Sequence, residues 1–468
     1  MQEPHNELKR ELSLLDGIML VSGSMIGSGI FIVSANMLLN IGSAGWLIFA
    51  WALSSIITIM AAVSYGELSA MFPQAGGQYV YLKESYNKLI AFLYGWSFFA
   101  VIQTGTIAAV GVAFAKFTSY LYPSFSEDNI LFEAGSFKVS AAQLLAVASV
   151  LVLTFFNSKG VRNAKYLQTF FTFIKIASLF GLVILGFSLA YDSQIWNANW
   201  ANAWDAKSYD ATTGSWVSIG GAVLFSALAA SMVGSLFSSD AWNGVTFISG
   251  EIKNPKRNVG LSLLLGTAIV SIVYVITNLM YLAVMPLEAI AFAPQERVAV
   301  AASQFIFGEM GTYIIAIMIM ISTFGCNNGL VMAGARVYYT MAKDGLFFSK
   351  AKNLNKFHVP SWGLWIQGVW ASVLCLTGKY GDLLDYVMII VMIFYILTIY
   401  GLFILRKKRP DLPRPYKAFG YPIIPFVYIV LASLFCMALL VDRTSTCGWG
   451  VVIMLSGIPI YYLTKKKD

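Results

Sequence analysis

The chain has 468 residues, of which 58% are hydrophobic, 15% aromatic and only 12% charged. This composition excludes an ordinary soluble fold, because stretches of about 20 apolar residues recur along the chain and each can cross a bilayer. The net charge of +8 does not indicate a nucleic-acid partner, since the basic residues gather in the loops between alternate apolar stretches.

Twelve apolar spans follow one another, separated by short polar loops without a low-complexity linker. The sequence therefore predicts an all-α integral membrane protein with twelve transmembrane helices, folded as a single domain over residues 1–468. The spans are expected near residues 14–40, 45–68, 89–118, 140–156, 163–190, 217–250, 259–285, 301–340, 361–378, 383–405, 422–441 and 446–463.

The basic residues are distributed unevenly over the loops. Most of the 31 Lys and Arg residues lie in the two tails and in the loops after spans 2, 4, 6, 8 and 10. The other loops lean acidic, as at Glu127, Asp128 and Glu133. Because positive charge stays on the inner side, we expect a multi-pass protein of the plasma membrane with both termini in the cytoplasm.

The first span contains three glycines within seven residues, Gly23, Gly27 and Gly29. Each weakens a helix interior by about 1 kcal/mol relative to alanine. Unwound backbone at that depth is tolerated only where it lines a cavity or is buried in protein. Gly23 and Gly27 also form a GxxxG pattern, so close helix packing explains the cluster equally well when it is considered alone.

Lys175 is an ionisable residue deep inside the fifth span. It lies about twelve residues from the inner end, hence about 18 Å deep on an α-helix, too deep to reach the interface easily. A lone ammonium inside the membrane is costly, so such residues are usually functional. The alternative is a structural cation that backbone carbonyls satisfy.

Three tryptophans, Trp196, Trp200 and Trp204, follow the fifth span at i, i+4 spacing. On a helix they would share one face. That face is expected to anchor the loop at the membrane interface, with an extracellular gate element as the alternative.

The sixth span contains polar groups and a carboxylate between Phe237 and Asn243. Spans 1 and 6 open two five-helix halves, residues 14–190 and 217–405, and an odd number of helices gives the halves opposite orientations. Paired interruptions in inverted halves indicate a transporter binding site. Exposed N–H groups at one half-helix end suit a carboxylate and carbonyls at another suit an ammonium, so the site is expected to hold a small zwitterion.

Asp240 is the other ionisable side chain at the depth of these interruptions. Three partners are open for it: the amine of the solute, Lys175, and the amides that the interruption of span 6 releases. A buried carboxyl can also carry a proton, so proton coupling stays open.

Other polar residues of the spans support less specific predictions. Lys116, near the outer end of span 3, is expected to snorkel to the interface rather than to bind a partner. Glu67 and Glu251, at inner helix ends, are expected to be cytoplasmic gate or capping residues. Three residues in the middle of span 3 are candidates for contact with the solute or for hydrogen bonds between helices, namely Gln103, Thr104 and Thr106.

Cysteine and histidine usage predicts no metal site and no enzyme. The two histidines, His5 and His358, lie outside the apolar spans, so a buried catalytic or zinc centre is not expected. No cofactor is expected either. The four cysteines lack C-x-x-C spacing and lie within or beside apolar spans, at Cys326, Cys375, Cys436 and Cys447.

Several motifs together are similar to those of one known family. They are residues 26–31 (IGSGIF), 73–79 (PQAGGQY), 242–243 (WN) followed by Glu251, and 414–416 (RPY). On these residues the chain resembles the amino acid–polyamine–organocation superfamily, in particular its L-type amino acid transporter branch and the bacterial serine/threonine exchangers. The resemblance implies a 5+5 inverted repeat of the LeuT-like type with broken helices 1 and 6, followed by helices 11 and 12 at residues 422–463.

The resemblance also implies roles for residues at the interruptions. Backbone amides of helix 1 would bind the substrate carboxylate, which implies Gly27, Ser28 and Gly29. Carbonyls of the two breaks would bind the amine, which implies Met25, Ile26, Phe237, Ser238 and Asp240. Phe237 would also be the aromatic gate over the substrate. The pair Ser238-Ser239 stands where relatives often have Ala-Tyr, a departure that bears on the preferred substrate side chain.

In the family, a lysine at the position of Lys175 takes the place of a sodium ion and bridges the helix 1 break to helix 8. Here the helix 8 contact would be Ser322 or Thr323. Relatives that work with a heavy-chain glycoprotein are tethered through a cysteine between helices 3 and 4. Residues 119–139 contain no cysteine, so no disulfide-linked heavy chain is expected.

The sequence and the resemblance together predict sodium-independent transport of neutral L-amino acids by alternating access, as an exchanger. Small substrates such as serine, threonine or alanine are favoured, and the expected partners are these amino acids and the lipid bilayer. The alternative is a proton-coupled amino acid symporter of the same fold, which Asp240 permits.

Overall fold

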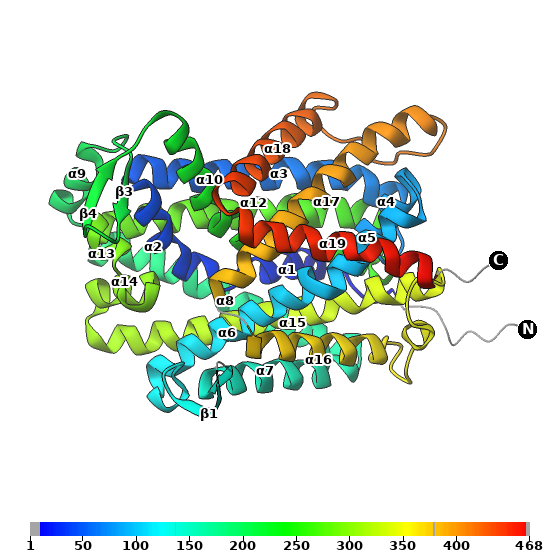
Figure 1. Ribbon diagram of the computed structural model, residues 1–468, viewed down its shortest axis with the longest axis horizontal. Coiled ribbons are helices and arrows are strands. Elements are labelled where there is room, and N and C mark those ends of the chain that lie inside the picture. The colour runs from blue at the N-terminus through cyan, green and yellow to red at the C-terminus, as the bar shows by residue number, and fades with distance from the viewer. Residues whose placement is uncertain (1–9, 136, 378–379, 465–468) are drawn as a thin grey trace, which may run out of the picture.

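The computed structural model describes residues 10–135, 137–377 and 380–464; His5 lies outside them. Long helices run roughly along one common direction (Figure 1). Two β hairpins and several short helices lie at one end of the bundle, which we call the hairpin end. The described part of the chain begins and ends at the opposite end, which we call the terminal end (Figure 1).

The first half of the chain contains the following helices and strands. They are α1 (Leu14–Met25), α2 (Gly29–Ile41), α3 (Ala44–Met71), α4 (Gln78–Ser85), α5 (Lys88–Ser97), a π-helical turn (Phe98–Ile102), α6 (Gln103–Leu121), β1 (Ile130–Ala134), β2 (Phe137–Ser140), α7 (Ala141–Ser158), α8 (Val161–Leu189), α9 (Ser193–Ala201), β3 (Lys207–Asp210) and β4 (Ser215–Ser218).

The second half is almost entirely helical. Its helices are α10 (Gly221–Ser238), α11 (Gly244–Phe247), α12 (Pro255–Val284), α13 (Leu287–Ala291), α14 (Val298–Phe307), α15 (Glu309–Lys343), α16 (Ser361–Thr377), α17 (Tyr380–Lys408), α18 (Ile423–Asp442) and α19 (Thr444–Thr464). Strands β1 and β2 pair antiparallel, as do β3 and β4.

The predicted all-α membrane class is confirmed. Within the described residues, ten helical stretches are long and apolar enough to cross a membrane. The predicted ninth and twelfth spans correspond to α16 and α19, whose apolar stretches are shorter, so the twelve-helix topology stays a prediction. The paired breaks of helices 1 and 6 are both present, because α1 and α2 are separate helices and so are α10 and α11.

Local sequence signals explain where several helices begin. Ser13 and Asp16 form a capping box at α1, in which each side chain accepts a hydrogen bond from the backbone of the other. Ser140 and Gln143 repeat this arrangement at α7. Pro255 occupies the first position of α12, where its missing N–H has no intrahelical partner to lose.

The predicted eighth span, 301–340, was wrong at its first residues. A separate helix, α14, ends at Phe307, and α15 begins at Glu309. Gly308 between them has φ 70° and ψ −162°, a conformation that glycine adopts far more readily than other residues. Both helices are apolar, so the hydropathy pattern did not reveal the division.

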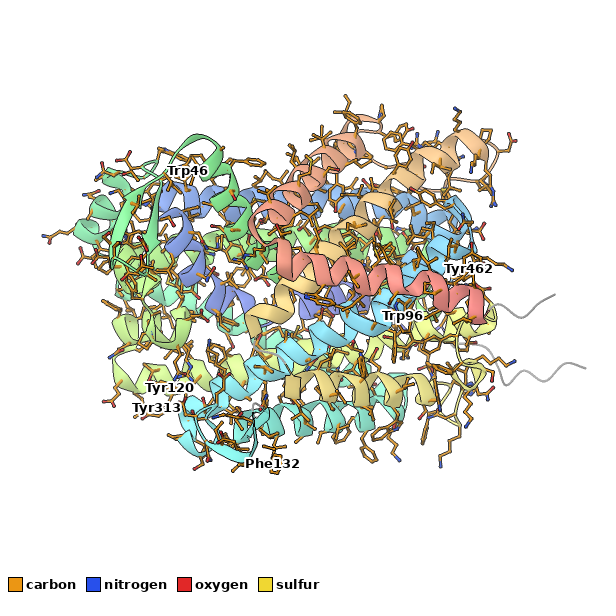
Figure 2. The ribbon with its side chains drawn as sticks, viewed as in Figure 1. Trp46, Trp96, Tyr120, Phe132, Tyr313 and Tyr462 are labelled. Atoms are coloured by element: carbon orange, nitrogen blue, oxygen red, sulfur yellow. The ribbon has the colours of Figure 1, made fainter. Side chains whose placement is uncertain are left out.

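Aromatic residues lie near both ends of the bundle, as expected for membrane interfaces. Figure 2 shows Trp46, Tyr120 and Tyr313 at the hairpin end and Tyr462 at the terminal end. The prediction that the tryptophans share one helix face is confirmed for two of them only, since Trp196 and Trp200 on α9 pack with ring centroids 5.3 Å apart; their role as an interface anchor stays a prediction. Trp204 follows the end of α9 and packs against Trp46 instead, at 5.6 Å.

Candidate functional site

The first break separates α1 from α2 by three residues, 26–28. The packing alternative also holds for one glycine of the cluster, because a Cβ on Gly23 would lie 2.0 Å from Thr172 Oγ1. Gly29 opens α2 and faces the other break, since a Cβ there would lie 1.8 Å from Ser238 Oγ. Glycine at these positions therefore serves both the interruption and the close approach of neighbouring helices.

The second break separates α10 from α11 by five residues, 239–243. Ala241 within it has φ 64°, a left-handed conformation that costs energy for a residue with a Cβ and is typical of functional segments. Ser238, the last residue of α10, lies against Gly29 of α2. The two interruptions, more than 200 positions apart in the chain, therefore meet in space.

Lys175 on α8 lies at the first break, as the resemblance implied. Its ammonium donates to the carbonyls of Gly23 and Ile26, at 2.7 Å each, and the side chain is 1% exposed. Ser322 Oγ on α15 donates to the same Ile26 carbonyl at 3.3 Å. Thr323 instead donates to the carbonyls of Ile319 and Met320 in its own helix, at 3.0 Å each. Of the two predicted residues on helix 8, Ser322 therefore reaches a carbonyl that Lys175 also binds, while a direct contact between Lys175 and helix 8 stays a prediction.

Two further donors at the end of α1 were not predicted. Cys326 Sγ on α15 donates to the Ser24 carbonyl at 2.9 Å. Tyr274 Oη on α12 lies 2.9 Å from the Met25 carbonyl and 3.0 Å from the Ser238 carbonyl. The last carbonyls of a helix have no intrahelical donor, so donors from other elements could be expected at the end of α1. That rule does not say which residues supply them.

The carbonyls expected to bind a substrate amine already receive protein donors. The Met25 carbonyl accepts from Gly27 N at 2.8 Å and from Tyr274. The Ile26 carbonyl accepts from Lys175 and Ser322. A carbonyl oxygen has two lone pairs, so an ammonium at either position would share the oxygen with these groups. Amine binding at Met25 and Ile26 stays a prediction.

Asp240 lies in the second break and is buried. Tyr395 Oη on α17 donates to its Oδ1 at 2.6 Å. Of the three partners left open, Lys175 directs its ammonium to carbonyls of the first break instead, while the amine of the solute and the released amides stay open. Tyr395 was not predicted, because nothing in the pattern of span 10 sets this tyrosine apart from its apolar neighbours.

A small pocket extends from Asp240 toward α6 and α17. Gln103 and Thr106 of α6 line it, as the solute-contact alternative required, although Gln103 Nε2 also donates to the Leu330 carbonyl at 2.6 Å. Thr104 donates to the Phe99 carbonyl at 2.7 Å. The residues that line the pocket are Gln78, Tyr94, Phe98, Ile102, Gln103, Thr106, Asp240, Ala241, Asn243, Leu330, Val391 and Tyr395.

A buried ion pair closes the bundle toward the terminal end. Arg336 Nε on α15 lies 2.9 Å from Glu251 Oε1, and both side chains are 1% exposed. Leu12 joins the same place through its backbone, because Leu12 N donates to the Glu251 carbonyl at 3.0 Å and Lys253 N donates to the Leu12 carbonyl at 2.8 Å. These contacts tie the segment before α1 and the segment after α11 to α15, as a gate would require.

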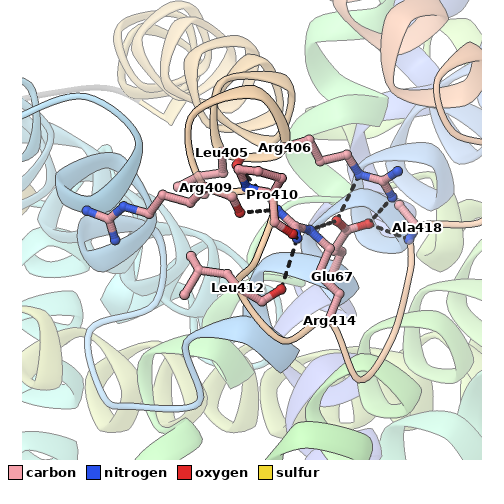
Figure 3. A network of polar contacts seen from close by, with 8 residues as sticks. All are labelled: Glu67, Leu405, Arg406, Arg409, Pro410, Leu412, Arg414 and Ala418. Carbon is pink, nitrogen blue, oxygen red and sulfur yellow. Dashed lines mark hydrogen bonds and ion pairs between the residues drawn. The ribbon is translucent and has the colours of Figure 1, made fainter.

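Glu67 on α3 is the centre of a second buried network (Figure 3). Its carboxylate accepts from Arg406 Nε at 3.0 Å and from Ala418 N at 2.7 Å, and it lies 3.3 Å from Arg414 Nε. Glu67 therefore does not cap its own helix. It joins α3 to the end of α17 and to the loop before α18. That loop contains residues 414–416 (RPY), one of the motifs on which the family resemblance rests.

Lys116 does not simply snorkel, so that prediction was wrong. Its ammonium pairs with Glu296 Oε2 at 3.0 Å. The neighbouring Arg297 donates through Nη2 to the Lys116 carbonyl at 2.6 Å and to Ser119 Oγ at 3.1 Å, and burial lowers the pKa of its guanidinium. At the hairpin end, this cluster joins α6 to the segment before α14.

The chain is similar in sequence to known amino acid transporters. A family model described as amino acid permease matches residues 12–462. The serine/threonine exchanger SteT of Bacillus subtilis (strain 168) is 27% identical over 470 residues, which cover 100% of this chain and 99% of SteT. The b(0,+)-type amino acid transporter 1 of Mus musculus is 27% identical over 97% of this chain and 88% of its own length. The Asc-type amino acid transporter 1 of Mus musculus is 29% identical over 97% and 81%.

Proposed function

Because the chain belongs to the amino acid permease family of the amino acid–polyamine–organocation superfamily, we propose that it exchanges small neutral L-amino acids across the plasma membrane without sodium. The family and the relatives named above are transporters rather than enzymes. The observation that carries this proposal is the contact of the two helix breaks through Gly29 and Ser238. This contact brings half-helix ends of opposite polarity to one place near the middle of the bundle.

The substrate would be bound mainly by backbone groups. Its carboxylate would lie at the start of α2, near the amides of Ser28 and Gly29, because a helix N-terminus suits an anion; the Gly27 amide already donates to the Met25 carbonyl. Its ammonium would lie among the carbonyls of Met25, Ile26, Phe237, Ser238 and Asp240. The side chain of Phe237, which is buried at the end of α10, would close over the bound solute.

Sodium independence is supported by Lys175. Its ammonium already donates hydrogen bonds to the Gly23 and Ile26 carbonyls, and Ser322 donates to the Ile26 carbonyl as well. A fixed protein cation there leaves no electrostatic need for a second cation at the same oxygens. Transport by the wild type would then be independent of sodium.

Alternating access would depend on the closures at the two ends. The terminal end, proposed to be cytoplasmic, would open by separating Glu251 from Arg336 and Leu12 from its partners. The hairpin end would open by separating Lys116 from Glu296. Because residues 119–139 contain no cysteine, we propose that the protein works without a disulfide-linked heavy chain.

Proton-coupled symport is the second candidate, and the Asp240–Tyr395 contact at 2.6 Å favours it. A buried carboxylate that accepts a hydrogen bond from one phenol can bind a proton when the solute leaves. Symport and exchange differ in whether a pH gradient drives accumulation.

Flux into proteoliposomes tests the proposal. Labelled L-serine, L-threonine and L-alanine would be supplied with and without internal amino acid, sodium and a pH gradient. We expect uptake that requires internal amino acid and does not change with sodium. Undiminished uptake into empty liposomes would contradict exchange, sodium stimulation would contradict the role of Lys175, and accumulation driven by a proton gradient would establish the symporter.

A further inference from the structure

Tyr274 lies between the two helix breaks. It belongs to α12, and its side chain is 0% exposed. Its hydroxyl oxygen lies 2.9 Å from the carbonyl of Met25 and 3.0 Å from the carbonyl of Ser238. These are the last residues of α1 and α10, so one hydroxyl reaches the carbonyl ends of both interrupted helices.

Three other donors near the site contact carbonyls of a single break. Lys175, Ser322 and Cys326 all donate to carbonyls of the first break. Tyr274 contacts both, yet a phenol has only one proton to donate. That proton is shared between the two carbonyls or alternates between them, and in both cases the two oxygens are held close to one point. Carbonyls so far inside a membrane need a donor, so this contact constrains how the breaks sit together.

The ring of Tyr274 is itself fixed by a closed set of contacts. It packs edge-on against Trp51 of α3, with ring centroids 5.3 Å apart. Trp51 Nε1 donates to Ser34 Oγ of α2 at 3.2 Å, and Ser34 donates to Asn278 Oδ1 at 2.6 Å. Asn278 lies one turn after Tyr274 on α12. The position of the hydroxyl is therefore set by α2, α3 and α12 together.

We propose that Tyr274 is a positioning residue for the amino group of the substrate. By holding the Met25 and Ser238 carbonyls together, its hydroxyl would present the ends of α1 and α10 to one ammonium at the same time. The proposal rests on the proposed function, since it presupposes an amino acid at the breaks. It adds a residue on α12 that touches no substrate atom and acts through two carbonyls.

Binding of L-alanine and N-methyl-L-alanine to purified protein in proteoliposomes tests the role of Tyr274. Methylation removes one N–H donor from the ammonium, so the ratio of the two affinities reports how many carbonyls the ammonium engages. In Tyr274→Phe we expect L-alanine to bind about tenfold more weakly, with a smaller loss for the methylated analogue. The matched control is Tyr281→Phe, because Tyr281 is also buried on α12 and donates to the Ile30 carbonyl at 3.3 Å, beyond the break. The control should keep both affinities within about twofold.

The outcomes separate this inference from the proposed function. If the wild type does not bind L-alanine, the proposed substrate class is wrong and the inference falls with it. If the wild type binds L-alanine but Tyr274→Phe binds it equally well or more tightly, only the role of Tyr274 is overturned. Equal losses for both ligands would also overturn it, since a general structural defect weakens the two alike. A lower ratio in Tyr274→Phe and an unchanged one in Tyr281→Phe would support it.

Discussion

The two helix breaks meet in space but are built differently. The first break contains no ionisable residue, and its carbonyls receive an ammonium, two hydroxyls and a thiol from α8, α12 and α15. The second break carries its own carboxylate, Asp240, which accepts a hydrogen bond from the phenol of Tyr395. Side chains of other helices therefore satisfy the carbonyls of the first break, whereas the second break keeps a charge that can respond to solute or protons.

Removing Lys175 should lower transport activity more than any other change at the two breaks. In Lys175→Met the Gly23 and Ile26 carbonyls lose their strongest donor, and an unpaired carbonyl in the membrane costs several kcal/mol. We expect exchange in proteoliposomes to fall at least about 100-fold, since about 2.7 kcal/mol suffices for that.

The control for Lys175 is Lys138→Met, which removes an exposed lysine of β2 that pairs with Glu133. It should keep exchange within about tenfold. Size-exclusion profiles would show whether each variant is folded. More than half of the wild-type activity in a folded Lys175→Met would contradict the account of the first break.

Crowding the contact between the breaks should have the next largest effect. In Gly29→Ala the new methyl would lie 1.8 Å from Ser238 Oγ, an overpacking expected to cost about 1–3 kcal/mol. Thermal unfolding in detergent should show a lower Tm, and adding Ser238→Gly should recover most of it.

Gly181→Ala on α8 is the control for that pair, because a Cβ at Gly181 would meet no atom within 4 Å. Its Tm should stay close to that of the wild type. If Ser238→Gly failed to restore the Tm of Gly29→Ala, the contact between the breaks would not be the cause of the loss.

Neutralising Asp240 tests whether the second break responds to charge. Asn at this position still accepts a hydrogen bond from Tyr395, so under exchange we expect Asp240→Asn to retain uptake within about threefold. Its profile between pH 5 and 8 should match that of the wild type. Loss of an accumulation that a proton gradient drives in the wild type would favour the symporter instead.

The smallest effect separates two neighbouring residues of α15. Ser322→Ala removes a donor from the Ile26 carbonyl, which should cost about 0.5–1.5 kcal/mol and raise KM for L-alanine a few-fold. Thr323→Ala removes only hydrogen bonds within α15 and should leave KM nearly unchanged. The opposite order of effects would assign the helix 8 contact to Thr323.

Features that depend on composition along one helix were predicted well. The long apolar spans, the division of span 1 at Gly27 and the polar interruption after Ser238 all follow from local properties of the chain. The position of Lys175 at the first break came from its depth and from the family resemblance. In each case, the cost of placing a polar group or a glycine in a membrane-spanning helix makes the residue conspicuous.

The tertiary structure alone decided which side chains meet these residues. Tyr274, Cys326 and Tyr395 are ordinary members of apolar spans, and the partner of Lys116 comes from a loop 180 residues away. A span that is apolar on all sides does not show which face points toward the bundle centre. Glycine and polar residues within apolar spans therefore determined the interruptions of helices 1 and 6, while only the packing of helices around them determined which donors complete the site.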